Sequence, residues 1–403
     1  MNLGEHTDIE AFRLEAKDWL AEHFPTALAD DPSRQAVDIF GPDNTDPDFL
    51  LWRARMGAKG WTVPLWPRHY GGGGLTESQA KVLANEMARI GATNPVQGMS
   101  VNLLGPTLLE FGSEEQKLRH LPPAARGEVR WCQGYSEPGA GSDLASLQCR
   151  AEDLGDSFLI NGQKVWTSGA HFAHWCFCLV RTDRSRKQGG ISFVLIDMRS
   201  PGVEALPIKL IYGGSTFCEV FFKDVVVPKA NLVGPLHGGW AVAKRLLQFE
   251  RGGIGDTRRA RGVRPLADIV REYGAFDSDG RLADADLRAR IAAHEIDARA
   301  VALTHQRIAL EHQAGIDAGA ATSILKNATI AADQTRMELI VELLGHDGLG
   351  WDGDAYPQEA LESTSADTVV GPEIVGRRPP SGQAPPSNRP RIDLGRGGGW
   401  TRT

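Results

Sequence analysis

The stretch that decides the fold reads Tyr135-Ser136-Glu137-Pro138-Gly139-Ala140-Gly141-Ser142-Asp143. Its glycines allow backbone N–H groups to come close to a bound group, and two serine hydroxyls flank them. Such a loop suits a phosphate or the polar edge of a heteroaromatic ring. It also fits a plain turn, because Pro-Gly and Gly-Ser-Asp are common turn residues. It is not a dinucleotide fingerprint, since a third glycine and a surrounding strand-then-helix unit are missing.

A second informative segment, Asn161-Gly162-Gln163-Lys164-Val165-Trp166-Thr167-Ser168, lies further along the chain. The runs 158–160 and 163–167 are joined by Asn-Gly, and that dipeptide between short apolar runs predicts a β-hairpin. Runs rich in aromatic and β-branched residues recur at 175–180, 191–196, 203–211 and 219–227, mostly separated by Gly and Pro. Strands at this spacing predict a small antiparallel sheet or barrel.

The chain on both sides of this β-region has a helical pattern. Residues 8–125 are mostly helical by apolar spacing, with Thr76 as the predicted N-cap of a helix over 78–89. Four glycines at 71–74 predict a loop, and a phosphate cradle is disfavoured there because no Lys-Ser or Lys-Thr follows. Helices are predicted again over 240–250, 287–309 and 320–344.

The predicted fold class is therefore α+β and multidomain. We expect an N-terminal helical domain over 1–128, a middle antiparallel β-domain or barrel over 129–235 and a C-terminal helical bundle over 236–362. From residue 363 the composition changes to Pro, Gly and Arg. Such a tail cannot bury enough apolar surface to order itself, so disorder is predicted over 363–403.

Composition argues against several classes of protein. The formal net charge of −7 argues against nucleic-acid binding, which needs a concentrated basic excess. No apolar stretch reaches transmembrane length, and residues 1–18 lack the apolar core of a signal peptide, so we expect a soluble cytoplasmic protein without a membrane span. Among five cysteines, Cys176 and Cys178 suggest a metal site. No second pair or histidine cluster has zinc spacing, which favours buried free thiols and no metal.

Taken together, the two segments resemble the acyl-CoA dehydrogenase family. Its motifs are a Thr/Ser-Glu-Pro-Gly-x-Gly-Ser-Asp loop and, further on, an Asn-Gly-x-Lys-x-Trp-x-Thr/Ser segment, and both are present here at 136–143 and 161–168. The stretches 67–72, 102–116, 219–228 and 231–234 also resemble the family, so that the resemblance covers 8–360 in order. It implies a three-part fold, with FAD between the β-domain and the helical domains, which agrees with the order of helices and strands above.

The resemblance also implies the roles of individual residues. Ser136 would bond to the edge of the isoalloxazine, Trp166 would pack against the flavin ring, and Ser168 would offer its hydroxyl near N5. The full set of implied cofactor-binding residues is Tyr135, Ser136, Gly141, Ser142, Trp166, Thr167 and Ser168.

The implied reaction is the α,β-dehydrogenation of an acyl-CoA thioester to a trans-2-enoyl-CoA, with electrons passed to an electron-transfer flavoprotein. The Glu-Arg pair at 250–251 makes Glu250 the expected catalytic base, and Ser142 and Arg251 the expected substrate-binding residues. A surface glutamate beside Arg251 is the competing interpretation, because most helical charges are merely solvated. The family also implies a homo- or hetero-oligomer, either a dimer or a tetramer.

Two departures from the family pattern keep other functions open. The Arg-x-x-Phe-Gly element of many members is absent from 256–286, and their Gly-Gly-Thr/Ser-x-Glu-Ile loop survives only as a degraded form at 368–374. In the family one backbone N–H of that loop holds the thioester carbonyl, and the loss of such a donor typically costs about 10²–10³ in rate. The alternatives are a non-catalytic or tail-impaired subunit of a heteromeric dehydrogenase, a flavin oxidase with a non-CoA substrate, and an inactive relative.

Overall fold

The structure is a computed structural model that describes residues 3–211, 213–252, 265–314, 316 and 321–345. The chain divides into two compact units, residues 1–253 and 254–403, and each is described by itself. Among the described residues, no helix is both long and apolar enough to cross a membrane. The predicted disorder over 363–403 concerns residues outside this description.

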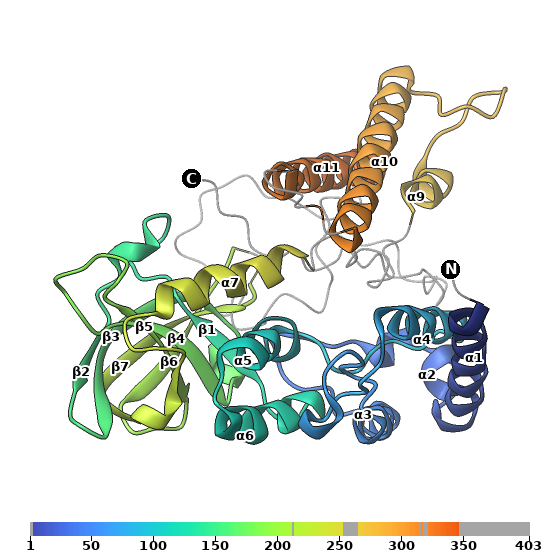
Figure 1. Ribbon diagram of the computed structural model, residues 1–403. Helices are drawn as coiled ribbons and strands as arrows, with labels where there is room; N and C mark the ends of the chain where they lie inside the picture. The colour runs from blue at the N-terminus through green and yellow to red at the C-terminus, as the bar shows by residue number, and fades with distance from the viewer. Residues whose placement is uncertain (1–2, 212, 253–264, 315, 317–320, 346–403) are drawn as a thin grey trace, which may run out of the picture. The chain divides into compact units, whose positions relative to one another are not determined.

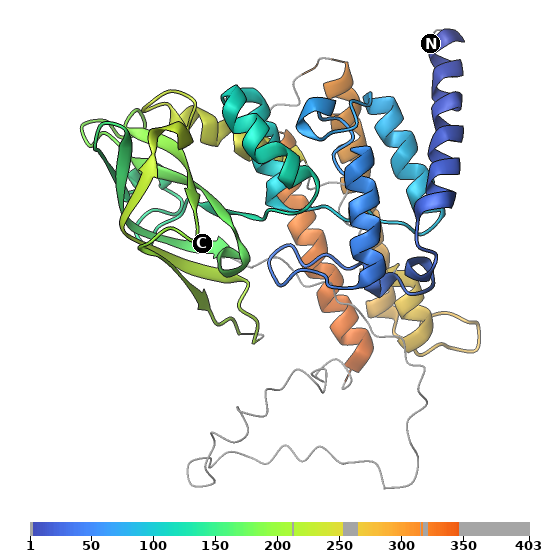
Figure 2. The same cartoon turned by 90° about the horizontal axis from the view of Figure 1, so that it is seen from below.

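The first unit begins with helices, as the apolar spacing predicts. They are α1 (Leu3–His23), α2 (Ala27–Asp30), α3 (Pro47–Lys59), α4 (Glu77–Arg89), α5 (Gly105–Phe111) and α6 (Glu114–Ala125). Helices α1 and α4 lie side by side in both Figure 1 and Figure 2, over a core that includes Leu20, Trp52 and Leu83. Thr76 caps α4 as predicted: its hydroxyl accepts the N–H of Gln79, whose side chain accepts the N–H of Thr76 in return.

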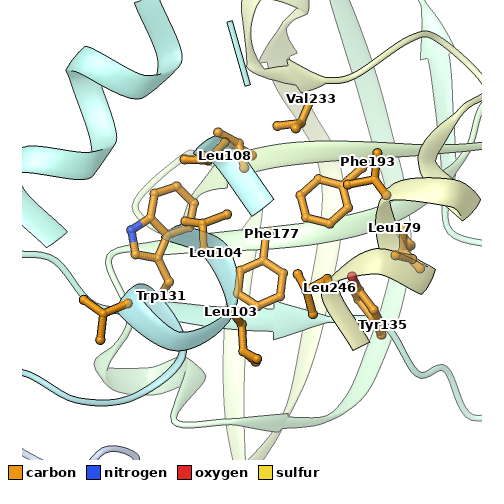
Figure 3. Packing of buried hydrophobic residues seen from close by; sticks show 14 of the residues in the cluster. Leu103, Leu104, Leu108, Trp131, Tyr135, Phe177, Leu179, Phe193, Val233 and Leu246 are labelled. Carbon is orange, nitrogen blue, oxygen red and sulfur yellow. The ribbon is translucent and has the colours of Figure 1, made fainter. Parts of the chain in front are cut away.

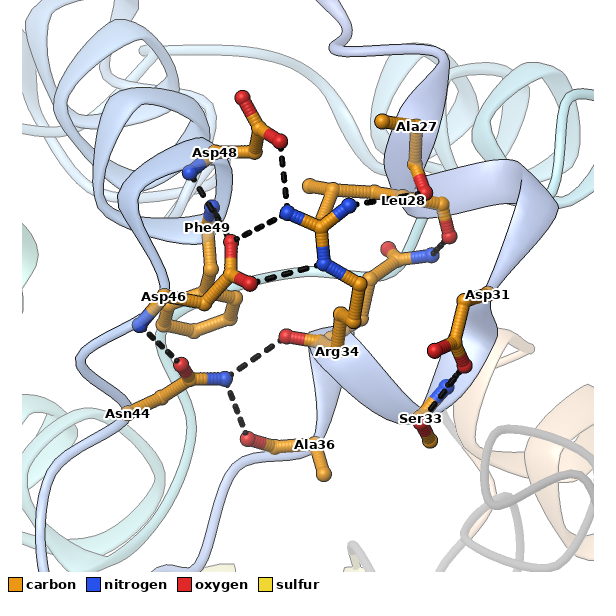
Figure 4. A network of polar contacts seen from close by, with 11 residues as sticks. Ala27, Leu28, Asp31, Ser33, Arg34, Ala36, Asn44, Asp46, Asp48 and Phe49 are labelled. Atoms are coloured by element: carbon orange, nitrogen blue, oxygen red, sulfur yellow. Dashed lines mark hydrogen bonds and ion pairs between the residues drawn. The ribbon is translucent and has the colours of Figure 1, made fainter.

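An ion-pair cluster fixes the start of α3 (Figure 4). Asp46 caps the helix by accepting the backbone N–H groups of Asp48 and Phe49. The guanidinium of Arg34 bonds to Asp46 at 2.8 Å and to Asp48 at 2.7 Å, and both carboxylates belong to the first turn of the helix or its cap. Cap and ion pairs together therefore hold the preceding loop against α3.

The β-domain is an eight-stranded sheet whose order is β6-β7-β3-β2-β4-β5-β8, with β1 paired to β4. Most neighbours are antiparallel as predicted, while β1 and β2 each pair with β4 in parallel. The strands are β1 (Trp131–Gly134), β2 (Arg150–Asp153), β3 (Ser157–Ser168), β4 (Trp175–Arg181), β5 (Ile191–Asp197), β6 (Val203–Ile208), β7 (Phe217–Pro228) and β8 (Leu232–Val233).

The predicted hairpin at Asn161-Gly162 is wrong, because β3 runs through these residues without turning. Both halves of β3 pair with β7, from Ser157↔Pro228 to Ser168↔Phe217, and the register shifts at Gly162 instead. A Cβ at Gly162 would lie 2.6 Å from the Cα of Cys149, so glycine serves a close backbone approach rather than a turn. The chain reverses earlier, between β2 and β3, where the Leu154 N–H bonds to the Ser157 carbonyl.

Helix α7 (Gly239–Gly252) follows the sheet and packs along β5 (Figure 1). Its buried residues Val242, Ala243 and Leu246 join a hydrophobic cluster shared by the sheet and by the helical region before it. Figure 3 shows Tyr135 within this cluster, together with Phe177, Phe193 and Leu246. The cluster therefore unites the loop after β1, the sheet and α7 in one core.

The second unit is helical among its described residues. It contains α9 (Leu266–Tyr273), α10 (Ala285–Gln313) and α11 (Ala321–Leu344), and the last two match the helices predicted over 287–309 and 320–344. Its own core includes Ile269 of α9, Leu287 of α10 and Leu339 of α11.

Candidate functional site

The loop 135–143 follows β1 and presents several polar groups to which no other described residue bonds. The backbones of Glu137 and Ala140 bond to each other in both directions at 3.0 Å, which closes the loop. A Cβ built at Gly139 or Gly141 meets no atom within 4 Å, so the space beside these glycines is open. Ser136 is half-buried and Ser142 is exposed, and within the described part of the chain neither hydroxyl has a hydrogen-bond partner. The loop can therefore donate to and accept from a ligand.

A buried ion pair holds this loop in place. The ammonium of Lys164 on β3 lies 2.8 Å from the Glu137 carboxylate, and the two side chains are 0% and 8% exposed. The same ammonium donates to the Tyr135 carbonyl at 3.0 Å. Glu137 also accepts the backbone N–H groups of Gln148 at 2.6 Å and Cys149 at 2.9 Å. Because each charge has several bonding partners, the pair compensates for its loss of hydration and links the loop to the sheet.

Trp166 stands beside this loop in a backbone conformation that is unusual for its residue type. Its φ of 59° lies in the left-handed region, where a bulky side chain is strained. The register of β3 against β7 shifts here, between Lys164 and Thr167. The ring is 52% exposed and meets only the edge of Phe217 among the aromatic side chains described. The neighbouring Val165 N–H donates to the Ser136 carbonyl at 2.9 Å, which brings Trp166 next to the loop.

A strained, half-exposed tryptophan is costly to maintain, because the strain and the exposed apolar surface both oppose folding. Such outliers cluster at ligand sites. The bulge therefore presents a flat, apolar surface at the end of β3, beside the loop.

The two residues after Trp166 differ in burial. Thr167 is fully buried, and its hydroxyl has no hydrogen-bond partner among the described residues. Only its backbone could contribute to a ligand outside the core. Ser168 is half-buried, pairs with Phe217 across the sheet, and has an unused hydroxyl within the described part of the chain. Its hydroxyl is therefore the better placed of the two for a polar contact.

Tyr135 points into the core rather than toward solvent. Its ring is 5% exposed and lies edge-on to Phe177 and Phe193. Burial, and after it the nearby Glu250 carboxylate, raises the pKa of Tyr135 well above its usual value. The hydroxyl has no bonding partner among the described residues. Sequence reasoning grouped Tyr135 with the cofactor-binding residues; the structure places its ring in the core, where the charge of Glu250 acts on its hydroxyl.

Glu250 lies near the C-terminal end of α7 and is exposed. Ala243, Leu246 and Glu250 follow one another at helical spacing on the same face of α7, and the first two are buried in the cluster that contains Tyr135. Glu250, the expected base, thus lies on the face of α7 whose preceding residues pack in the cluster that contains Tyr135. The side chain of Arg251 lies outside the described residues, as do 253–264 and the degraded motif at 368–374.

Two anchoring residues carried no role in the sequence analysis. Lys164 is one, and Arg181 is the other: it is 6% exposed, and its guanidinium donates to the carbonyls of Ala145, Leu147, Arg186 and Lys187. Burial lowers the pKa of Arg181, and no carboxylate is bonded to it among the described residues. For Arg181 the available signal was a charged residue at the end of an otherwise apolar strand, since buried charges must be paired or multiply bonded.

The cysteines agree with the expectation of free thiols. All five are buried and none forms a disulfide. Across the described ranges, no group of three or more His, Cys, Asp or Glu side chains is arranged to hold a metal ion.

Comparisons with known proteins cover the same regions. Family models described as the N-terminal, middle and C-terminal domains of acyl-CoA dehydrogenase match residues 7–128, 132–225 and 237–371, in that order. The chain is 40% identical over 277 residues to the acyl-CoA dehydrogenase IpdE1 of Mycobacterium tuberculosis, spanning 67% of this chain and 71% of that protein. It is 38% identical over 287 residues to the IpdE1 of Mycolicibacterium smegmatis, spanning 67% and 72%.

Two solved structures are similar to this chain over most of its length. The structure named Tcur3481-Tcur3483 steroid ACAD has a TM-score of 0.66 and 29% identity over 88% of each chain. The ChsE4-ChsE5 complex from Mycobacterium tuberculosis has a TM-score of 0.66 and 28% identity, over 87% of this chain and 88% of that one. The predicted fold, with its helical, β and helical regions, is confirmed by these matches. This chain belongs to the acyl-CoA dehydrogenase family.

Proposed function

We propose that this chain is an FAD-dependent oxidoreductase that dehydrogenates an acyl-CoA thioester at its α,β bond to give a trans-2-enoyl-CoA. The single observation that most supports this is the Trp166 bulge, where a strained, 52% exposed indole stands beside the open loop 135–143. A flavin ring is a flat ligand with a polar edge, so it would use both the indole face and the free hydroxyls nearby.

The residues present fit the cofactor. The unused hydroxyls of Ser136 and Ser168 can bond to a polar ring edge, and the open space at Gly141 accommodates a close approach. Ser142 can bond to cofactor or thioester, whereas buried Thr167 and Tyr135 contribute only through their backbones on this side. FAD, when bound, supplies the acceptor for the hydride that leaves the β-carbon.

Glu250 is the proposed base that removes the α-proton. The electron pair of the broken Cα–H bond forms the new double bond as the β-hydrogen departs with its own pair. Support comes from the position of Glu250 on the α7 face that also carries Ala243 and Leu246, and from its electrostatic effect on Tyr135 next to the loop. A carboxylate is suited to this role once the ligand excludes water around it. Arg251 is proposed to contact the CoA part of the substrate, and an electron-transfer flavoprotein is the proposed electron acceptor.

Two features bear on the substrate and the assembly. The relatives at 28–29% identity include one named as a steroid ACAD and another named as a ChsE4-ChsE5 complex. We therefore propose a bulky, polycyclic acyl group and an oligomer. Because one of these relatives is named as a complex of ChsE4 with ChsE5, the second candidate function is a non-catalytic subunit of a heteromeric dehydrogenase.

Anaerobic titration of the purified protein with acyl-CoA esters tests the proposal. We expect a yellow protein whose absorbance near 450 nm bleaches with a polycyclic acyl-CoA and less with straight-chain esters. The variant Glu250→Gln should keep its colour and lose bleaching, while Glu115→Gln, an exposed helical glutamate on α6, should bleach as the wild type does.

A colourless protein would refute FAD binding. Bleaching that persists in Glu250→Gln would assign the base elsewhere. A yellow protein that never bleaches alone, but forms an active complex unaffected by Glu250→Gln, would favour the non-catalytic subunit.

A further inference from the structure

The hydroxyl of Tyr135 is a buried polar group that stands out in the described part of the chain. The side chain is 5% exposed, and among the described residues its oxygen has no hydrogen-bond partner. Buried hydroxyls are nearly always bonded, so an unpaired one indicates a partner that joins in another state of the protein. The surrounding rings of Phe177 and Phe193 offer only edge contacts and fix the direction of the phenol.

The candidate partner is the carboxylate of Glu250, whose charge acts on the phenol. Helix α7 brings Leu246 into the same cluster as Tyr135 (Figure 3). Glu250 follows Leu246 by four residues, one turn later on the same face of the helix. Burial raises the pKa of Tyr135, and the negative charge of Glu250 raises it further. Glu250 is exposed in this structure, so its carboxylate is free to turn toward the core.

Other charged and titratable groups around these two residues are accounted for. On β4, a hydrogen bond to Cys132 together with burial raises the pKa of Cys176, and burial raises that of Cys178, so both thiols are neutral near pH 7. The Lys164 ammonium faces the Tyr135 carbonyl and is paired with Glu137.

In the part of the chain that the structure describes, the elements packed against α7 bring no competing free charge. On α5, Glu110 pairs with Arg245 of α7, and on β5, Asp197 pairs with Arg199. On α7 itself, Lys244 is exposed. Among the described residues, Glu250 is thus the charged group that can accept a hydrogen bond from the Tyr135 hydroxyl.

We propose that Tyr135 is a positioning residue whose hydroxyl donates a hydrogen bond to the Glu250 carboxylate when a bound ligand covers the end of α7. This inference rests on the proposed function, in which Glu250 is the base. The bond holds the carboxylate in one orientation, and it favours the charged form, which is the form that accepts the α-proton. Tyr135 itself exchanges no proton with the substrate.

The test is the pH dependence of flavin reduction by a saturating acyl-CoA, followed by stopped-flow absorbance on the full-length holoprotein. Tyr135→Phe keeps the ring and removes the donor, so the midpoint of the pH profile should rise by about one pH unit. Below both midpoints this equals about a tenfold loss of rate, whereas the alkaline plateau should remain. Replacing Tyr135 with 3-fluorotyrosine, a more acidic phenol and stronger donor, should move the midpoint the other way.

Tyr70→Phe is the matched control. Tyr70 is buried like Tyr135, and its hydroxyl donates to the Glu114 carboxylate at 2.7 Å, so the substitution also removes a tyrosine–carboxylate bond, on helix α6 instead of α7. Its pH profile should match that of the wild type.

An unchanged midpoint in Tyr135→Phe, or an equal shift in Tyr70→Phe, overturns the inference while the proposed function stands. If Tyr135→Phe does not bind flavin, the 3-fluorotyrosine protein provides the test instead. A pH midpoint that does not fall in that protein overturns the inference. A wild-type protein that is not reduced, or a Glu250→Gln variant that still is, overturns the proposed function and with it the inference.

Discussion

The buried pair Lys164–Glu137 offers a sharp test of what holds the loop 135–143 in place, through the substitution Lys164→Met. Methionine is of similar length and apolar, so it leaves the Glu137 carboxylate 8% exposed without its counter-charge. Glu137 would keep the N–H groups of Gln148 and Cys149, which cannot neutralise it. Removing one partner of a buried pair costs about 3–5 kcal/mol of the free energy of unfolding. For a unit of this size the melting temperature should fall by roughly 6–20 °C.

An exposed ion pair on the same loop is the control. Lys187 and Asp143 lie 2.7 Å apart, close to the 2.8 Å of the buried pair, but their side chains are 59% and 61% exposed. Lys187→Met should therefore cost only about 0.2–1 kcal/mol. Urea unfolding followed by circular dichroism measures both variants, and the ratio of absorbance at 280 and 450 nm measures retained flavin.

The double variant Lys164→Met/Glu137→Gln separates charge from packing. It should be more stable than Lys164→Met by about 1 kcal/mol or more, because the unpaired buried charge is gone. The reasoning is refuted if Lys164→Met and Lys187→Met destabilise equally, or if the double variant is no more stable than the single one.

Three further predictions follow from burial and backbone strain. Trp166→Gly should leave the free energy of unfolding within about 1 kcal/mol of the wild type, because glycine adopts a φ of 59° without strain, yet the flavin content should fall; full retention of flavin would contradict the assigned role. Burial, followed by the Arg119 charge, lowers the pKa of His120 from 6.5 to about 4, so the unfolded chain binds a proton at higher pH than the folded one. Stability should then be complete above pH 6.5 and fall by on the order of 3 kcal/mol as the pH drops toward 4, and His120→Gln should flatten this dependence in urea unfolding at pH 4.5 and 7.5. The five buried thiols should react with a thiol reagent such as 5,5′-dithiobis-(2-nitrobenzoic acid) only after unfolding, and fast labelling of the native protein would contradict their burial.

Features set by neighbouring residues could be predicted from the sequence. The capping of α4 by Thr76 and Gln79 depends on residues three positions apart, and the order of helices, strands and helices depends on local apolar spacing. The motifs at 135–143 and 161–168 were also readable, because close backbone approach and flat-ring contact each demand particular residue types. These local patterns were sufficient to predict the family and its fold.

Features that depend on distant partners could not be read in the same way. Asn161-Gly162 has the local chemistry of a turn, but pairing of both halves of β3 with β7, some sixty residues later, makes it a bulge. In the sequence Tyr135 belongs to a candidate ligand loop, and only packing against β4, β5 and α7 shows that its ring is buried and that its hydroxyl bonds to no other described residue.

The sequence by itself determined that this chain has a loop and a tryptophan suited to a flavin, since those requirements are local. Only the tertiary structure decided what supports them. The Lys164–Glu137 pair joins β3 to the loop, and α7 brings Glu250 to Tyr135, across sequence separations of 27 and 115 residues. Burial and long-range charge depend on the whole fold, because they are set by which segments meet and not by their order along the chain.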